Sequence, residues 1–136
     1  MLALARMARM LEHALSRDTT PPISLSDYRM LSAVAGGEAR ASRLARRLAV
    51  GKPAISASVD SLARRGLLTR HGGAADQRAI DLRITPDGDR VRVEAERALA
   101  RVVVDIANRT DDPAGTVAAL ADFGAALEQR QAAPRA

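Results

Sequence analysis

The sequence predicts a mainly α-helical protein with one small β-hairpin, and three observations lead to this fold class. Apolar residues recur at three- and four-residue spacing through most of the chain, which is the period of an amphipathic helix. Apolar and polar residues alternate at residues 80–84, which indicates a half-buried strand. Proline and glycine stand between these segments, where helices begin and end. A length of 136 residues fits one structural domain.

The first predicted helix covers residues 2–15. Residues 16–23 then form a linker, because Pro21 and Pro22 cannot continue a helix. An arginine-containing amphipathic start is also typical of a transit peptide. We interpret it instead as a helix of a mature cytoplasmic protein, since charges interrupt the apolar run and no cleavage site follows. The predicted inner face consists of Leu4, Met7, Ala8, Leu11, Ala14 and Leu15.

Three short helices follow in the middle of the chain. Ser24 and Asp27 have the spacing of a capping box at the start of the first, and Gly36 and Gly37 end it. The second covers residues 41–49. The third begins after Gly51 with Pro53 in its first turn, and ends at Arg64, Arg65 and Gly66. The predicted inner residues are Tyr28, Leu31 and Val34, then Leu44, Ala45 and Leu48, then Ile55, Val59, Leu62 and Ala63.

A hairpin and two further helices complete the prediction. The strands are residues 67–70 and 80–84, joined by a glycine-rich tip. Thr85 and Pro86 begin a helix that runs to about Thr110. Asp112 and Pro113 begin the last helix, which runs to about Gln129, and residues 131–136 are expected to be disordered. The predicted inner residues are Val91, Ala95, Ala98, Leu99, Val102 and Ile106, then Val117, Leu120, Phe123, Gly124 and Leu127.

Positive charge is concentrated in the middle third of the chain. The formal net charge is +5 overall, but residues 40–78 alone carry eight Arg and Lys52 against Asp60 and Asp76. A localised basic patch favours a polyanionic partner, although a solvated arginine-rich surface would have the same composition. The absence of cysteine excludes disulfides, thiolate metal sites and cysteine nucleophiles. Two histidines cannot form a His-rich metal cluster, no catalytic constellation is present, and no apolar run is long enough to span a membrane. We therefore predict neither an enzyme nor a cofactor.

A helix, a tight turn, a helix and a hairpin with a glycine-rich tip form a winged helix-turn-helix, whose second helix fits the DNA major groove. At this point the sequence resembles the multiple antibiotic resistance regulator (MarR) family. The motifs that carry the resemblance are Ile23-Ser24-x-x-Asp27-Tyr28-x-Met30-Leu31, Leu44-Ala45-x-x-Leu48, Ile55-x-x-x-Val59-Asp60-x-Leu62-x-x-x-Gly66-Leu67-Leu68, Asp76-x-Arg78 and Leu82-x-Ile84-Thr85-x-x-Gly88.

The resemblance implies a winged helix-turn-helix DNA-binding lobe at residues 23–85 and a helical dimerisation region at residues 1–22 and 86–136, within one structural domain. It implies a homodimeric transcription regulator, a repressor that binds double-stranded DNA at a pseudo-palindromic operator. It also implies a cleft in which a small aromatic or apolar effector loosens DNA binding.

The resemblance also implies roles for single residues. Arg78 would enter the minor groove, with Asp76 orienting it, although Gln77 stands where the family often has a second arginine. The alternative is a surface pair that pins the hairpin. Lys52, at the start of the recognition helix, would contact phosphate or base. Some of the arginines on and around the helix-turn-helix would contact phosphate, and the candidates are Arg40, Arg43, Arg46, Arg47, Arg64, Arg65 and Arg70.

The outward face of the recognition helix consists of small residues. The predicted face consists of Pro53, Ala54, Ser56, Ala57 and Ser61; small residues can touch thymine methyls, and Ser56 can hydrogen-bond a base or phosphate. This composition predicts sparse direct readout of sequence. It also leaves open a second interpretation, in which the chain is a helical dimer that acts through protein partners and its winged helix no longer binds DNA.

The remaining candidates belong to the implied ligand cleft and to the histidines. Tyr28, Met7, Met10 and Met30 are candidate cleft residues, since methionine adapts to varied apolar ligands, but plain core packing explains them as well. His71 could contact phosphate or sense pH, or simply be exposed.

Overall fold

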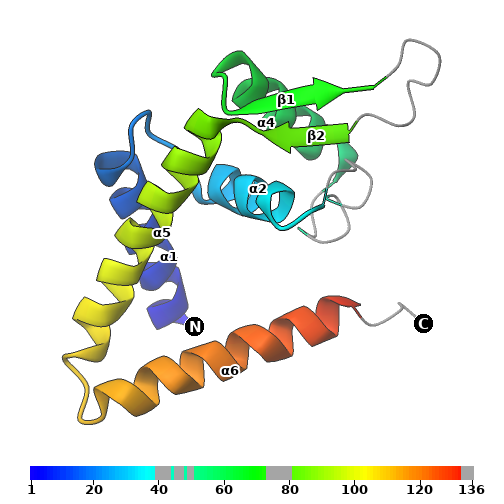
Figure 1. Cartoon of the computed structure of the whole chain (residues 1–136). Coiled ribbons are helices and arrows are strands. Elements are labelled where there is room, and N and C mark those ends of the chain that lie inside the picture. Colours follow the sequence, from blue (N-terminus) through cyan, green and yellow to red (C-terminus); the bar gives the residue numbers. More distant parts are fainter. Residues whose placement is uncertain (39–43, 45–47, 49–50, 73–80, 133–136) are drawn as a thin grey trace.

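The computed structural model describes residues 1–38, 44, 48, 51–72 and 81–132, and it confirms a mainly α-helical chain with one small hairpin (Figure 1). The elements are α1 (Leu2–Asp18), α2 (Leu25–Ala35), α4 (Lys52–Arg64), β1 (Leu68–His71), β2 (Asp81–Ile84), α5 (Pro86–Ala107) and α6 (Pro113–Ala132). One end of the molecule holds α2, α4 and the hairpin of β1 and β2. The helices α1 and α5 pack against each other beside this group, and α6 turns back from the end of α5 and lies apart from the other helices.

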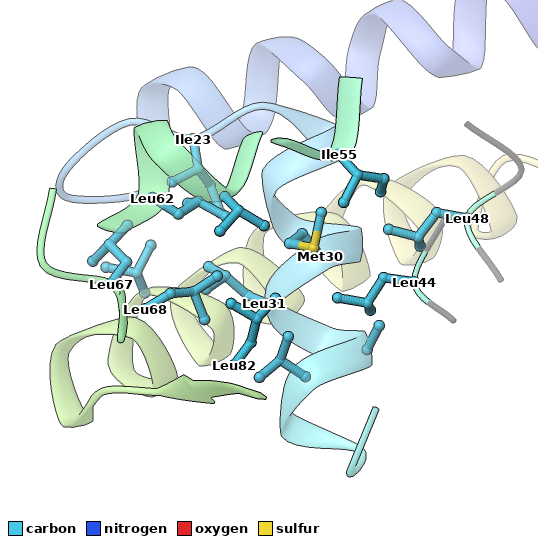
Figure 2. Packing of buried hydrophobic residues seen from close by; sticks show 14 of the residues in the cluster. Ile23, Met30, Leu31, Leu44, Leu48, Ile55, Leu62, Leu67, Leu68 and Leu82 are labelled. Atoms are coloured by element: carbon cyan, nitrogen blue, oxygen red, sulfur yellow. The ribbon is translucent and has the colours of Figure 1, made fainter. Parts of the chain in front are cut away.

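One hydrophobic core joins α2, α4, the hairpin and the start of α5, and we call this group the winged-helix lobe. Leucines from four segments meet in it, and Met30 lies among them (Figure 2). Leu44 and Leu48 are helical and buried, as predicted for the second short helix. The fully buried large side chains are Leu15, Met30, Leu31, Leu44, Leu62, Leu67, Leu68, Leu82 and Val91. Tyr28 and Ala63, predicted inside, are only half-buried.

The predicted helix starts are confirmed in atomic detail. The Ser24 hydroxyl accepts a hydrogen bond from the Asp27 amide at 3.0 Å, and the Asp27 carboxylate accepts one from the Ser24 amide at 3.1 Å. This is the reciprocal capping box. At the start of α5 the Thr85 hydroxyl accepts from the Gly88 amide at 3.0 Å, with Pro86 in the first turn. Both caps satisfy amides that have no partner inside the helix.

The turn from α4 into the hairpin is a Schellman motif. The amide of Gly66, whose φ is +70°, donates to the Ala63 carbonyl at 3.0 Å, and the Leu67 amide donates to the Leu62 carbonyl at 2.9 Å. This pairing needs a left-handed residue, which glycine supplies without steric cost. Leu67 is therefore part of the turn, and the first strand begins one residue later than predicted.

The hairpin pairs Leu68 with Ile84, Thr69 with Arg83, Arg70 with Leu82 and His71 with Asp81. Leu68 and Leu82 are buried, while Thr69, His71, Asp81 and Arg83 are exposed. The alternation predicted for the second strand is therefore confirmed for Asp81–Ile84, because successive side chains of a strand point to opposite faces. Ile80 and the tip at residues 73–80 lie outside the described residues.

Three helix ends differ from the prediction. α1 continues to Asp18 because the Thr19 hydroxyl, itself buried, donates to the Leu15 carbonyl at 2.7 Å and accepts from the Ile23 amide at 3.2 Å. α5 ends at Ala107, where amides bond to carbonyls three residues back and tighten the last turn. α6 extends to Ala132, so residues 131 and 132 are helical rather than disordered. Residues 133–136 lie outside the described part.

The predicted inner faces of α6 and of the start of α1 are exposed in this chain. For α6 the prediction was wrong because this helix lies apart from the other helices, so no described segment covers its apolar side (Figure 1). On α5, by contrast, Val91, Ala95 and Ala98 are buried, and Leu99 is half-buried. The exposed residues that had been predicted inside are Leu4, Ala8, Val117, Leu120, Phe123 and Leu127. Within the described residues no helix is long and apolar enough to cross a membrane.

Candidate functional site

The outward face of α4 is the first part of the candidate site. Pro53, Ala54, Ser56 and Ala57 are exposed, while Ile55 and Val59 point into the lobe and are buried. This division follows from the helical period, because positions three and four apart share a face. The face is solvent-accessible, narrow and almost free of charge, as the sequence predicted. It suits close approach to another surface more than discrimination through many hydrogen bonds.

The start of α4 is shaped by two backbone features. Gly51 is the N-cap, with extended backbone, and its carbonyl accepts from the Ile55 amide at 3.1 Å. Lys52 is the first helical residue and Pro53 follows it in the first turn. The first turn of a helix carries a partial positive charge, so this end of α4 favours a negatively charged partner.

The C-terminal end of α4 has one exposed arginine and one that is structural. Arg64 is exposed and forms no ion pair with any described residue. Arg65 is half-buried. Its guanidinium lies 3.2 Å from the Asp27 carboxylate and also donates to the Pro22 carbonyl. Arg65 therefore fastens the end of α4 to the start of α2, and its charge is neutralised within the lobe.

The basic residues of the hairpin lie on opposite faces. Arg70, opposite Leu82, turns toward α4 and forms an ion pair with Asp60. Arg83 is exposed on the other face, opposite Thr69. His71 is exposed on that same face, with its ring nitrogen Nε2 2.9 Å from the Thr69 hydroxyl. Neither Asp60 nor Arg83 was predicted as a site residue. The strand alternation could have found Arg83, whereas the partner of Asp60 could not be read from the sequence.

Several predicted site residues lie outside the part of the chain that the structure describes. Arg78 and Asp76, predicted for the hairpin tip, lie outside the described residues. The same holds for Arg40, Arg43, Arg46 and Arg47, the candidate phosphate contacts of the second short helix. The described part of the site consists of the α4 face, Arg64 and the hairpin.

The four candidate cleft residues do not line one hollow. Met30 is 1% exposed and Tyr28 packs against the core from α2, whereas Met7 is half-buried and Met10 is exposed on α1. A small hollow does open between α2 and α4, where Arg29 donates to the Leu48 carbonyl at 2.9 Å. Of the four candidates only Met30 reaches it. The residues that line the hollow are Ser26, Arg29, Met30, Leu48, Ala54, Ile55 and Ser58.

Acidic side chains hold the linker between α1 and α2 in place. Glu94 of α5 accepts from the Thr20 amide at 3.1 Å and from Arg90 at 2.7 Å, and Glu12 accepts from the Leu25 amide at 3.1 Å. The Thr20 amide and then the Arg90 guanidinium lower the pKa of the Glu94 carboxyl. The Asp18 carboxylate forms ion pairs with Arg17 and Arg101. The hydrogen bond from Arg17 is the main cause that lowers the pKa of this carboxyl. Charge-assisted contacts thus connect α5 to α1 and to the linker, and α1 to the start of α2.

Comparison with known proteins points to one family. A model of the MarR family matches residues 22–79. The transcriptional regulator BldR from Sulfolobus solfataricus is 26% identical, with a TM-score of 0.69 over 90% of this chain and 90% of that chain. A MarR family transcriptional regulator from Rhodococcus is 16% identical, with a TM-score of 0.77 over 97% of this chain and 90% of that chain.

A third structure is a mutant of E. coli MarR in complex with operator DNA. It is 17% identical, with a TM-score of 0.72 over 93% of this chain and 88% of that chain. At this identity the likeness is one of fold. A search among curated proteins finds no match.

Proposed function

We propose that this chain is a member of the MarR family of transcription regulators, whose model matches residues 22–79, and that it binds operator DNA in a sequence-specific manner. Proteins of this family are transcription regulators and not enzymes. Acting on DNA, the chain would work in the cytoplasm. We propose a repressor, as the family resemblance implies.

One observation supports DNA binding more than any other. The outward face of α4 is exposed over Pro53, Ala54, Ser56 and Ala57, beside a hairpin with basic residues. An exposed helix face of this width fits the major groove, and a hairpin beside it reaches the neighbouring backbone or minor groove. The mutant of E. coli MarR, which is similar in fold, was solved with operator DNA bound.

The proposed roles of the single residues follow the same geometry. Lys52 and the small residues after it would face the major groove, with Ser56 as the hydrogen-bonding side chain. Arg78 would enter the minor groove and Asp76 would orient it. Phosphate contacts would position the protein on the duplex without reading its sequence. The arginines proposed for that role are Arg40, Arg46, Arg47 and Arg64.

We also propose that the chain acts as a homodimer. The apolar side of α6 is exposed at four large residues, and an exposed apolar stripe of this kind marks an interaction site. Two copies would present two winged-helix lobes to the two halves of a pseudo-palindromic operator. A small aromatic or apolar effector would then loosen DNA binding by favouring another arrangement of the lobes.

Fluorescence anisotropy tests the proposal directly. The purified protein is titrated into a duplex from upstream of its own gene and into an unrelated duplex, at two salt concentrations. We expect specific binding that weakens steeply with salt, because each phosphate contact releases a counterion. Arg78→Ala should weaken specific binding. Arg109→Ala removes the same charge from the far end of α5 and should leave binding unchanged.

A second candidate function is favoured by the almost uncharged face of α4. In that case the chain is a helical dimer that acts through protein partners, and its winged helix no longer binds DNA. No binding to either duplex at low salt would support this alternative and contradict the repressor. Equal, weak binding to both duplexes would contradict sequence-specific recognition.

A further inference from the structure

We propose that Asp60 and Arg70 form a positioning pair, which fixes the angle between α4 and the hairpin and thereby sets the specificity of the proposed DNA recognition. Asp60 lies on α4 and Arg70 on β1, and their side chains form an ion pair that bridges the two elements. This inference rests on the proposed DNA-binding function. It gives Arg70 a role different from the direct phosphate contact that the sequence suggested.

The pair is the outer of two attachments between α4 and the hairpin. The inner one is the turn at residues 65–67, which holds Leu67 and Leu68 in the core. The hairpin also packs on the core through the buried Leu82, but a hairpin joined to α4 only at the turn could still change its angle to that helix. Arg70 is paired with Leu82, and at the next register His71 and Asp81 are both exposed. Among the described residues, Arg70 therefore marks the outermost point at which the hairpin is tied to α4.

The exposure of the pair argues against a mainly stabilising role. The Arg70 side chain is 42% exposed and that of Asp60 is 52% exposed. Ion pairs at such exposed sites contribute little to folding stability, because water screens them. Loss of this pair should consequently leave the fold intact while freeing the hairpin to take other angles. A protein that must place a helix and a hairpin on one duplex together loses affinity when their relative position is no longer fixed.

Because Asp60 is charged, the proposal can be tested by whether Asp60→Asn strengthens or weakens DNA binding. Asp60 carries a negative charge on the helix that would face DNA, so simple electrostatics expects Asp60→Asn to bind DNA more tightly. The positioning role expects the reverse, because Asp60→Asn releases Arg70. Asp81→Asn is the matched control, since Asp81 is an exposed acid on the hairpin that forms no ion pair with a described residue.

The experiment measures anisotropy with the same two duplexes for wild type, Asp60→Asn, Arg70→Gln, the double variant and Asp81→Asn. We expect each single variant to lose about tenfold in affinity for the upstream duplex, with little change for the unrelated one. The double variant should lose no more than either single variant, because residues in contact do not act additively. Asp81→Asn should bind as tightly as wild type or more tightly. Thermal unfolding by circular dichroism checks that all variants are folded.

Three results would overturn the proposal. The first is that Asp60→Asn binds the upstream duplex as tightly as wild type or more tightly. The second is that Arg70→Gln weakens binding to both duplexes equally and lowers the salt slope by about 0.9, which is the signature of one lost phosphate contact. Failure of the wild type to bind the upstream duplex specifically overturns the proposed function as well, so the wild-type titration separates the two failures.

Discussion

The winged-helix lobe and α6 contain similar apolar residues and use them differently. In the lobe, leucines from four segments converge, and Leu62 is 0% exposed. On α6, Leu120 and Phe123 recur at the same helical spacing, yet Phe123 is 56% exposed. Helical periodicity identifies an apolar face, but it does not say whether the same chain covers that face. The core of the lobe is closed within this chain, with Leu15 of α1 included, whereas α6 would need a partner, so the stability of α6 should depend on protein concentration.

The largest expected effect is a core truncation in the lobe. Leu62→Ala should lower the free energy of unfolding by about 2–5 kcal/mol, because it removes buried contacts and leaves a cavity. The matched change on α6, Leu120→Ala, should cost under about 0.5 kcal/mol at protein concentrations where the chain is monomeric. Chemical denaturation at low and high protein concentration measures both. Equal losses at low concentration would contradict the division between a closed lobe and an open α6.

Alanine substitutions at two helical glycines should change the stability in opposite directions. A Cβ at Gly88 would collide with the Leu67 carbonyl oxygen and lie 2.9 Å from Ile84 Cγ1, whereas a Cβ at Gly124 meets nothing described within 4 Å. Gly88→Ala should therefore destabilise the lobe by about 1–3 kcal/mol through overpacking. Gly124→Ala should stabilise α6 by about 0.5–1 kcal/mol, because alanine favours helix.

Thermal unfolding over a range of protein concentrations measures both glycine variants. If Gly124→Ala instead weakened self-association, α6 would pack closely against a partner at that residue. If Gly88→Ala left the stability unchanged, the packing between the hairpin and α5 would be looser than it is in the structure.

The smallest expected effect concerns pH and the contact between α5 and the linker. The pKa of the Glu94 carboxyl is lowered in the folded chain, so the ionised form contributes stability above the unfolded pKa of about 4.3. This contribution is lost as the pH falls through the lower folded pKa. Wild type should consequently melt slightly higher than Glu94→Gln near neutral pH, and the difference should shrink in acid. A difference that grew on acidification would contradict the assignment.

The local rules of the sequence predicted the helix starts well. Ser24 with Asp27 and Thr85 with Pro86 each act within one turn, so their spacing alone defines the cap. The helix ends were predicted less well. α1 continues to Asp18 because the Thr19 hydroxyl bonds both to the helix and to the linker, and that second contact depends on how the linker folds.

Of the described part of the candidate site, the sequence predicted the exposed face of α4 and little else. The period of α4 placed Ala54 and Ala57 outward correctly. The sequence could not predict which arginines are ion-paired, because Arg65 is neutralised by Asp27, which is 38 residues away in the chain. A formal charge counted over residues 40–78 includes Arg65 but not its partner Asp27, whereas Arg70 and its partner Asp60 are both counted there. The positive charge available to a partner is smaller than the sequence suggested.

The scarcity of aromatic residues gives each region its own native spectroscopic label. The chain has one tyrosine, one phenylalanine and no tryptophan. Tyr28 packs against the core of the lobe, and Phe123 lies on the exposed side of α6. Emission excited at the tyrosine band thus reports on the lobe alone, without resonance transfer to an indole. Fluorine placed on the ring of the single phenylalanine would report on the environment of α6, so the two regions can be followed separately in one sample.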